Sequence, residues 1–179
     1  MKHKRKLLNE ELDRLSVDQF KKADKIPVKI VLDNIRSQHN IGSVFRTADA
    51  FRLQGIILCG ITATPPNREM RKTALGATES VEWIHRERTR DAIMELRKDS
   101  YQIIAVEQTE NSVSLEELQL SATGKYAIVF GHEIRGIDQE IIDLSDRVVE
   151  IPQFGTKHSL NISVAAGIII WEVYRLLPL

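Results

Sequence analysis

The sequence predicts an α/β protein with a mostly parallel sheet and helices on both of its faces. Two observations carry this prediction. Short, almost wholly apolar segments alternate along the chain with segments whose apolar residues recur at helical spacing. Strands without polar alternation are typical of parallel sheets, which are buried on both faces.

The expected strands share short apolar runs rich in β-branched residues, bounded by turn-forming residues. They are residues 28–32, 55–60, 101–106, 126–130 and 148–151. Ligands of such sheets bind outside the carboxyl ends of the strands. The loops that follow these strands are therefore where a site is expected.

The expected helices show apolar residues three and four positions apart, as Val44, Ala48 and Phe51 do. They are residues 41–53, 89–98, 138–144 and 159–176. A further short helix is expected after Ser114, because Ser114 and Glu117 have the spacing of a capping box.

Residues 1–25 are expected to form a basic N-terminal helical arm, and residues 26–179 a single domain. The arm carries eight basic and five acidic residues, and its leucines recur at roughly helical spacing. Two interpretations stay open: a solvated tail helix packed on the body, or an arm that contacts RNA.

The composition excludes several classes of protein. The chain has 25 basic and 25 acidic residues, which argues against nucleic-acid binding by bulk charge but allows local basic patches. Cys59 is the single cysteine, and the histidines lack metal-ligand spacing, so neither a disulfide nor a metal site is expected. No targeting or membrane-spanning segment is recognisable, which favours a cytoplasmic protein.

The first polar cluster, residues 34–51, crosses the expected boundary between a strand and a helix. Asn40 is a candidate N-cap, and Gly42 precedes Arg46 by one turn, which would clear space beside the guanidinium. Such a helix start suits a phosphate or carboxylate. The alternative is an ion pair between Arg46 and Asp49.

Two further clusters follow the last two expected strands. In residues 130–137, Gly131 and Gly136 allow tight turns around Glu133, which orients a ligand or a partner loop, or is merely solvated. In residues 151–167, Ser159 and Asn161 offer polar groups at the start of a helix with small residues, and the alternative is capping by Ser159 alone. Neither cluster has the glycine pattern of a dinucleotide-binding oxidoreductase or of a P-loop.

Together the three clusters resemble the motifs of the TrmH-type branch of the SPOUT superfamily of RNA 2′-O-ribose methyltransferases. The first motif is Asn40-x-Gly42-x-x-x-Arg46-Thr47-Ala48-Asp49. The second is Phe130-Gly131-x-Glu133-x-x-Gly136. The third is Ile151-Pro152-x-x-Gly155-x-x-x-Ser159-Leu160-Asn161-x-Ser163-x-Ala165. The three motifs occur in the family's order, and the resemblance runs from about Val28 to Tyr174.

The resemblance implies a C-terminal trefoil knot and S-adenosylmethionine as cofactor. By resemblance, the cofactor would contact Val106, Glu107, Gly131, Ile151, Ser159 and Leu160. The family's catalytic positions match Arg46, Asn40, Glu133, Ser159 and Asn161. Because an arginine stays protonated, Arg46 is expected to grip an RNA phosphate and lower the pKa of the ribose hydroxyl.

The resemblance also implies a homodimer and a tRNA or rRNA substrate. The motif sequences are closer to those of the tRNA-type members. The rival interpretation is a non-catalytic RNA-binding relative with the same fold. Retention of the motif residues argues against it, because a relative without activity need not keep them.

Overall fold

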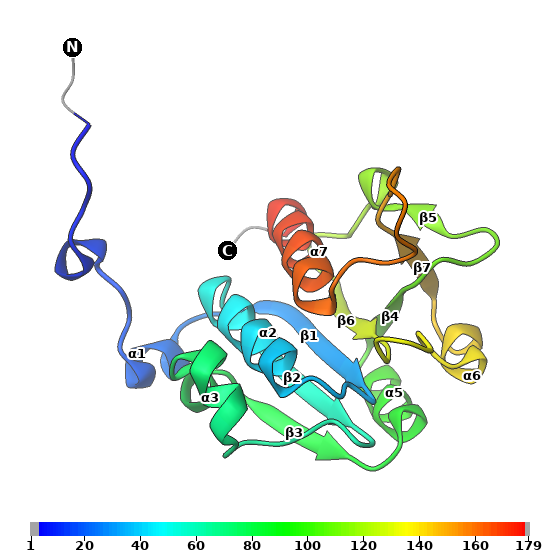
Figure 1. Ribbon diagram of the computed structural model, residues 1–179, viewed down its shortest axis with the longest axis horizontal. Coiled ribbons are helices and arrows are strands. Elements are labelled where there is room, and N and C mark those ends of the chain that lie inside the picture. The colour runs from blue at the N-terminus through cyan, green and yellow to red at the C-terminus, as the bar shows by residue number, and fades with distance from the viewer. Residues whose placement is uncertain (1–3, 178–179) are drawn as a thin grey trace.

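The computed structural model describes residues 4–177 and has a seven-stranded sheet at its centre (Figure 1). Every neighbouring pair of strands is parallel, which confirms the predicted sheet. In spatial order the strands are β3 (Trp83–Arg86), β2 (Leu53–Cys59), β1 (Ile26–Asp33), β6 (Lys125–Phe130), β4 (Tyr101–Val106), β7 (Arg147–Glu150) and β5 (Val113–Ser114).

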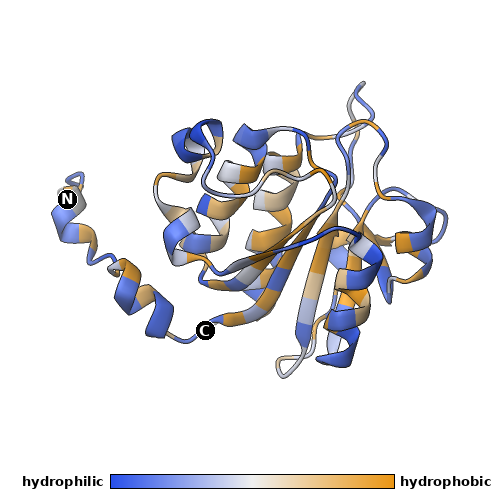
Figure 2. Cartoon of the chain, turned by 90° about the horizontal axis from the view of Figure 1, so that it is seen from below, coloured by the Kyte–Doolittle hydropathy of each residue, from blue (hydrophilic) through white to orange (hydrophobic). Residues whose placement is uncertain are grey.

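Helices cover both faces of the sheet, as predicted. One face carries α2 (Gln38–Ala50), α3 (Arg68–Ala74), α4 (Ala77–Ser80) and α7 (Ile162–Leu176), and the other carries α5 (Thr89–Lys98) and α6 (Gln139–Asp143). Successive residues of one strand serve opposite cores: Ile30 and Leu32 pack toward α2 and α7, whereas Val31 packs toward α5. Figure 2 shows the resulting apolar strands enclosed between the helical layers.

Several boundaries differ from the prediction. The helix expected at 41–53 begins earlier, at Gln38, and Leu53 already belongs to β2. The final helix begins at Ile162 instead of Ser159. The capping-box sequence forms only a 3-10 turn, η2 (Leu115–Glu117), and the Ser114 side chain makes no cap hydrogen bond.

Four short elements were not predicted from the sequence: α3, α4, β3 and β5. The strand β3 lies at the edge of the sheet and pairs only with β2, so its sequence Trp-Ile-His-Arg lacks a buried apolar run. The helix α3 is capped by Asn67, whose Oδ1 accepts hydrogen bonds from the amides of Glu69 and Met70.

The N-terminal arm is not the single amphipathic helix expected from its leucines. It contains a 3-10 turn, η1 (Asn9–Leu12), and one short helix, α1 (Val17–Lys22), which packs on the body through buried Phe20. Leu7, Leu8, Leu12 and Leu15 are exposed, and Figure 1 shows the segment before α1 leading away from the body. The division at residue 25 stays a prediction, and residues 1–3 and 178–179 lie outside the described part.

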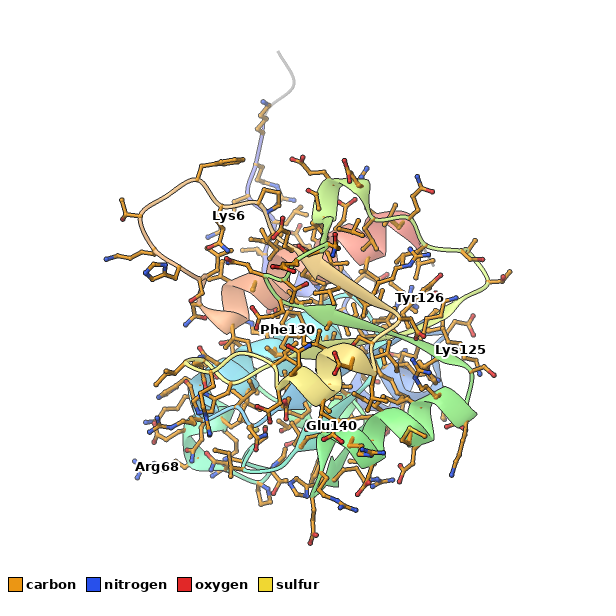
Figure 3. All side chains as sticks on the ribbon, turned by 90° about the vertical axis from the view of Figure 1, so that its right-hand side faces the viewer. Lys6, Arg68, Lys125, Tyr126, Phe130 and Glu140 are labelled. Atoms are coloured by element: carbon orange, nitrogen blue, oxygen red, sulfur yellow. The ribbon has the colours of Figure 1, made fainter. Side chains whose placement is uncertain are left out.

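The segment between β7 and α7 passes beside the loop that follows β4. The Gln108 Nε2 after β4 donates to the His158 carbonyl oxygen at 2.9 Å. Figure 3 shows this segment as a wide loop that projects from the body. The trefoil knot itself stays a prediction. Within residues 4–177, no helix is both long and apolar enough to cross a membrane, and no cluster of ligating side chains could hold a metal ion.

Candidate cofactor site and motif network

A cavity of about 620 Å³ opens at the carboxyl ends of β4, β6 and β7. Its walls come from the loops that follow these strands and from the first turn of α7. All six residues expected to contact a cofactor line it: Val106, Glu107, Gly131, Ile151, Ser159 and Leu160. The cavity therefore lies where the parallel sheet predicts a ligand, and its size is typical of a small-molecule site.

Glu107 connects two of the loops that line this cavity. Its carboxylate accepts hydrogen bonds from the backbone amides of Gln108, at 2.8 Å, and Ile137, at 3.2 Å. A Cβ at Gly136, whose φ is +68°, would lie 2.3 Å from Glu107 Oε2. The carboxylate thus holds the loop of the second motif, a contact that the sequence did not indicate.

The second motif is compact because its two glycines touch. A Cβ at Gly131 would lie 2.4 Å from the carbonyl carbon of Gly136, so a larger residue would force the loop open. Inside the turn, the Nδ1 atom of buried His132 accepts a hydrogen bond from the Ile134 amide at 3.0 Å. This role of His132 was not predicted, because a lone histidine in a loop carries no spacing signal.

Glu133 joins the second motif to the first. Its carboxylate oxygens accept hydrogen bonds from the amides of Arg36, at 3.1 Å, and Ser37, at 3.0 Å. Partial burial alone would raise the pKa of Glu133, but the bonds from these amides outweigh it and the pKa is lowered. The alternative of a merely solvated glutamate is therefore wrong.

Asn161 joins the third motif to the first. Its Oδ1 accepts from the Ser163 amide at 2.9 Å, which makes Asn161 the N-cap of α7, and its Nδ2 donates to Asn40 Oδ1 at 3.2 Å. The expected N-cap role of Asn40 is wrong, because Ser37 caps α2. Capping by Ser159 alone is wrong too: Ser159 is exposed and lines the cavity.

Arg46 lies on the exposed side of α2 and is not part of the cavity lining. The alternative ion pair with Asp49 is wrong, because the Asp49 carboxylate accepts instead from the Ser80 hydroxyl. Gly42 does not clear space for the guanidinium either. A Cβ there would lie 2.3 Å from the Met70 carbonyl oxygen, so Gly42 permits the close approach of α3.

The loop between β1 and α2 is held by buried polar groups. The Thr62 hydroxyl donates to the Leu32 carbonyl at 3.0 Å and accepts from the Ile35 amide at 2.9 Å. Asp33, which is 2% exposed, accepts from the hydroxyl of Thr89. Burial raises the pKa of Asp33 above its usual range despite that hydrogen bond.

Comparison with known proteins agrees with this arrangement. Residues 27–171 match the model of the SpoU rRNA Methylase family. A protein of Staphylococcus saprophyticus described as a TrmH family tRNA/rRNA methyltransferase is 31% identical over 159 residues, which cover 89% of this chain and 63% of that protein. The chain thus spans less than two thirds of that relative.

Two solved structures resemble the fold. One is an AdoMet-bound rRNA methyltransferase from Sinorhizobium meliloti, with a TM-score of 0.78, 27% identity, and coverage of 87% of this chain and 59% of that one. The other concerns the 2-OH methylation of C/U34 on tRNA, with a TM-score of 0.72, 25% identity, and coverage of 83% and 95%. The family match spans most of the chain and all three motifs, and it confirms the resemblance found in the sequence. The chain belongs to the SpoU rRNA methylase family.

Proposed function

We propose that this protein transfers the methyl group of S-adenosylmethionine to a ribose 2′-hydroxyl of tRNA or rRNA, with tRNA slightly preferred. The observation that carries the proposal is the convergence of the three motifs. Glu133 and Asn161 reach the start of α2 by hydrogen bonds, and both line the cavity. A cofactor held there would lie beside the helix that carries Arg46.

The lining of the cavity fits the proposed cofactor. Apolar side chains of Ile151, Leu160 and Ile162 can cover an adenine, and the carboxylate of Glu150 offers an acceptor for hydroxyl or amino groups. When bound, S-adenosylmethionine supplies an electrophilic methyl group on a positively charged sulfur. The work left to the chain is positioning and charge stabilisation.

The roles of the motif residues follow from their chemistry. Arg46 binds an RNA phosphate and lowers the pKa of the nearby 2′-hydroxyl electrostatically. It does not act as a base, since the guanidinium stays protonated. Asn40 and Asn161, which bond each other, orient the ribose. Glu133 keeps the start of α2 against the cavity, and Ser159 offers a hydroxyl at its rim.

We also propose that the protein acts as a homodimer. Val164, Ile168 and Trp171 follow one stripe of α7 and are 50%, 37% and 52% exposed. An apolar stripe of this kind marks a contact surface.

Arg46→Ala tests the assignment. Methyl transfer from radiolabelled S-adenosylmethionine to bulk tRNA or rRNA should be lost, whereas calorimetry should show unchanged cofactor binding. Arg88→Ala, on the far face of the sheet, is the control and should stay active. Full activity of Arg46→Ala would refute the role of Arg46. A wild-type protein that binds RNA, but neither binds the cofactor nor transfers its methyl group, would favour the interpretation as a non-catalytic relative.

A further inference from the structure

The arginines of the two faces of the sheet differ in their partners. On the side of α5, four arginines of β3, of α5 and of the turn between them each pair with an acid. The pairs are Arg86 with Glu95, Arg88 with Asp91, Arg90 with Glu140, and Arg97 with Asp146. In Figure 3, Glu140 lies on α6 beside α5. This face therefore presents little unbalanced positive charge.

The arginines around α2 and α3 have no such partners. Arg36, Arg46, Arg68 and Arg71 are exposed, and none forms an ion pair with another described residue. Residues 34–75 contain six lysines and arginines but only two acids.

Neither of these acids pairs with Arg36, Arg46, Arg68 or Arg71. Glu69 pairs with Lys72 and contacts His39, and Asp49 accepts from Ser80. A chain with zero net charge thus carries a concentrated positive surface here, which we call the basic face (Arg36, Arg46, Arg68 and Arg71).

Packing fixes the two helices of the basic face relative to each other. Gly42 brings α2 against α3, and the Thr73 hydroxyl donates to the His39 carbonyl at 2.9 Å. Figure 3 shows Arg68 pointing outward from this edge of the molecule. The two helices that carry these arginines are therefore held in fixed positions next to each other.

The basic face leads to the cavity. Arg36 lines a second, smaller cavity of about 340 Å³, together with Ser37, Asn40, Glu133 and Ile134. Glu133 and Ile134 also line the larger cavity. The unpaired charges thus run from α3 along α2 to the rim of the candidate cofactor site.

We propose that the basic face binds the phosphates of an RNA strand and directs one nucleotide into the cavity. The proposal rests on the proposed function, because it names the surface that would hold the substrate. Phosphate contacts by arginine release counterions and give affinity that falls with salt. A neutral chain has no bulk attraction to RNA, so an unpaired local cluster has to supply it.

The test uses Arg68→Gln/Arg71→Gln, two positions outside the motifs, in the full chain. Binding of bulk tRNA and of rRNA fragments is measured as a function of salt, without cofactor. The slope of the logarithm of the RNA association constant against the logarithm of salt concentration is negative. Its magnitude should decrease by about 1.5 in this variant, because each lost phosphate contact removes about 0.7–0.9 from it. Arg68→Lys/Arg71→Lys keeps the charges and should keep the slope.

The matched control is Arg88→Gln/Arg90→Gln, which removes the same charge from the face where arginines are paired. Its slope should stay at the wild-type value. Equal slopes for the two glutamine variants, whether both unchanged or both reduced, would overturn the proposal.

Cofactor calorimetry and methyl transfer separate this result from the proposed function. If the wild type methylates RNA and Arg68→Gln/Arg71→Gln binds RNA with the wild-type salt slope, the proposed role of the basic face is refuted and the proposed function is not. A salt slope that depends on the basic face without any methyl transfer refutes the proposed function alone.

Discussion

The Nδ2 atom of Asn161 donates a hydrogen bond to the Oδ1 atom of Asn40 at 3.2 Å, across 121 residues of sequence. The same Asn161 side chain accepts from the Ser163 amide and so caps α7. One amide group therefore ends the loop of the third motif and joins it to the first turn of α2. This dual use allows the two tasks to be separated by substitution.

Asn161→Asp should keep the cap and lose the donor to Asn40, whereas Asn161→Ala should lose both. We expect Asn161→Ala to lower the free energy of unfolding by about 1 kcal/mol, the usual loss for an N-cap. Both variants should lose methyl-transfer activity, and urea titration should show that Asn161→Asp remains near wild-type stability. Equal instability of the two variants would contradict separate roles.

Glu133 should make stability depend on acid. Because the pKa of Glu133 is lowered from its ordinary value of 4.5, its stabilising hydrogen bonds are present above that value and are lost as the pH falls through the lowered pKa. Wild type should exceed Glu133→Gln in urea stability at pH 7, and the difference should shrink below pH 4.5. A difference that is constant with pH would show that the carboxylate charge contributes nothing.

The contribution of Asp33 to stability should change with pH in the opposite direction to that of Glu133. Burial raises its pKa above the ordinary value of 3.8, so its contribution to stability falls as the pH rises from that value through the raised pKa. Asp33→Asn cannot ionise, so its stability relative to wild type should increase over this range. Urea unfolding of both proteins at several pH values measures the difference, and a decreasing difference would contradict the assignment.

Gly42→Ala should destabilise the protein, because its Cβ would lie 2.2 Å from Thr73 Oγ1 and 2.3 Å from the Met70 carbonyl oxygen. Overpacking of this kind costs about 1–3 kcal/mol, and we expect the upper end because a backbone atom has to move. Gly155→Ala, outside the helices, is the control: nothing lies within 4 Å of its Cβ, so the free energy of unfolding should stay within about 0.5 kcal/mol of wild type. Unfolding midpoints at one protein concentration decide, and equal effects would exclude the close α2–α3 contact as the cause.

The sequence predicts the layers of this fold better than its edges. The helix at Thr89–Lys98 and the strand at Tyr101–Val106 appear with the predicted bounds, because their apolar periodicity is set by deep burial. The edge strand β3 has no such pattern, since one side of it faces no neighbouring strand. Burial, the physical cause of the pattern, is weaker in β3 than in the central strands.

The candidate site was predicted as a set of residues but not as a network. Ser37 and Asn40, like Ser159 and Asn161, are all good N-cap residues, so local sequence cannot rank them. The roles of these residues depend on distant groups. Glu133 accepts hydrogen bonds from the amides of Arg36 and Ser37, and Asn161 donates one to Asn40. Such long-range hydrogen bonds leave no periodic signal in the chain.

The most direct test of the central claim is mass spectrometry of the nucleosides from RNA incubated with the protein and S-adenosylmethionine that carries a deuterated methyl group. Bulk tRNA and rRNA are treated separately, digested and analysed. Methyl transfer to the ribose predicts a 2′-O-methylnucleoside that carries the deuterated methyl group, present with wild type and absent with Arg46→Ala. A label found only on a base, or no labelled nucleoside from either RNA despite cofactor binding, would contradict it.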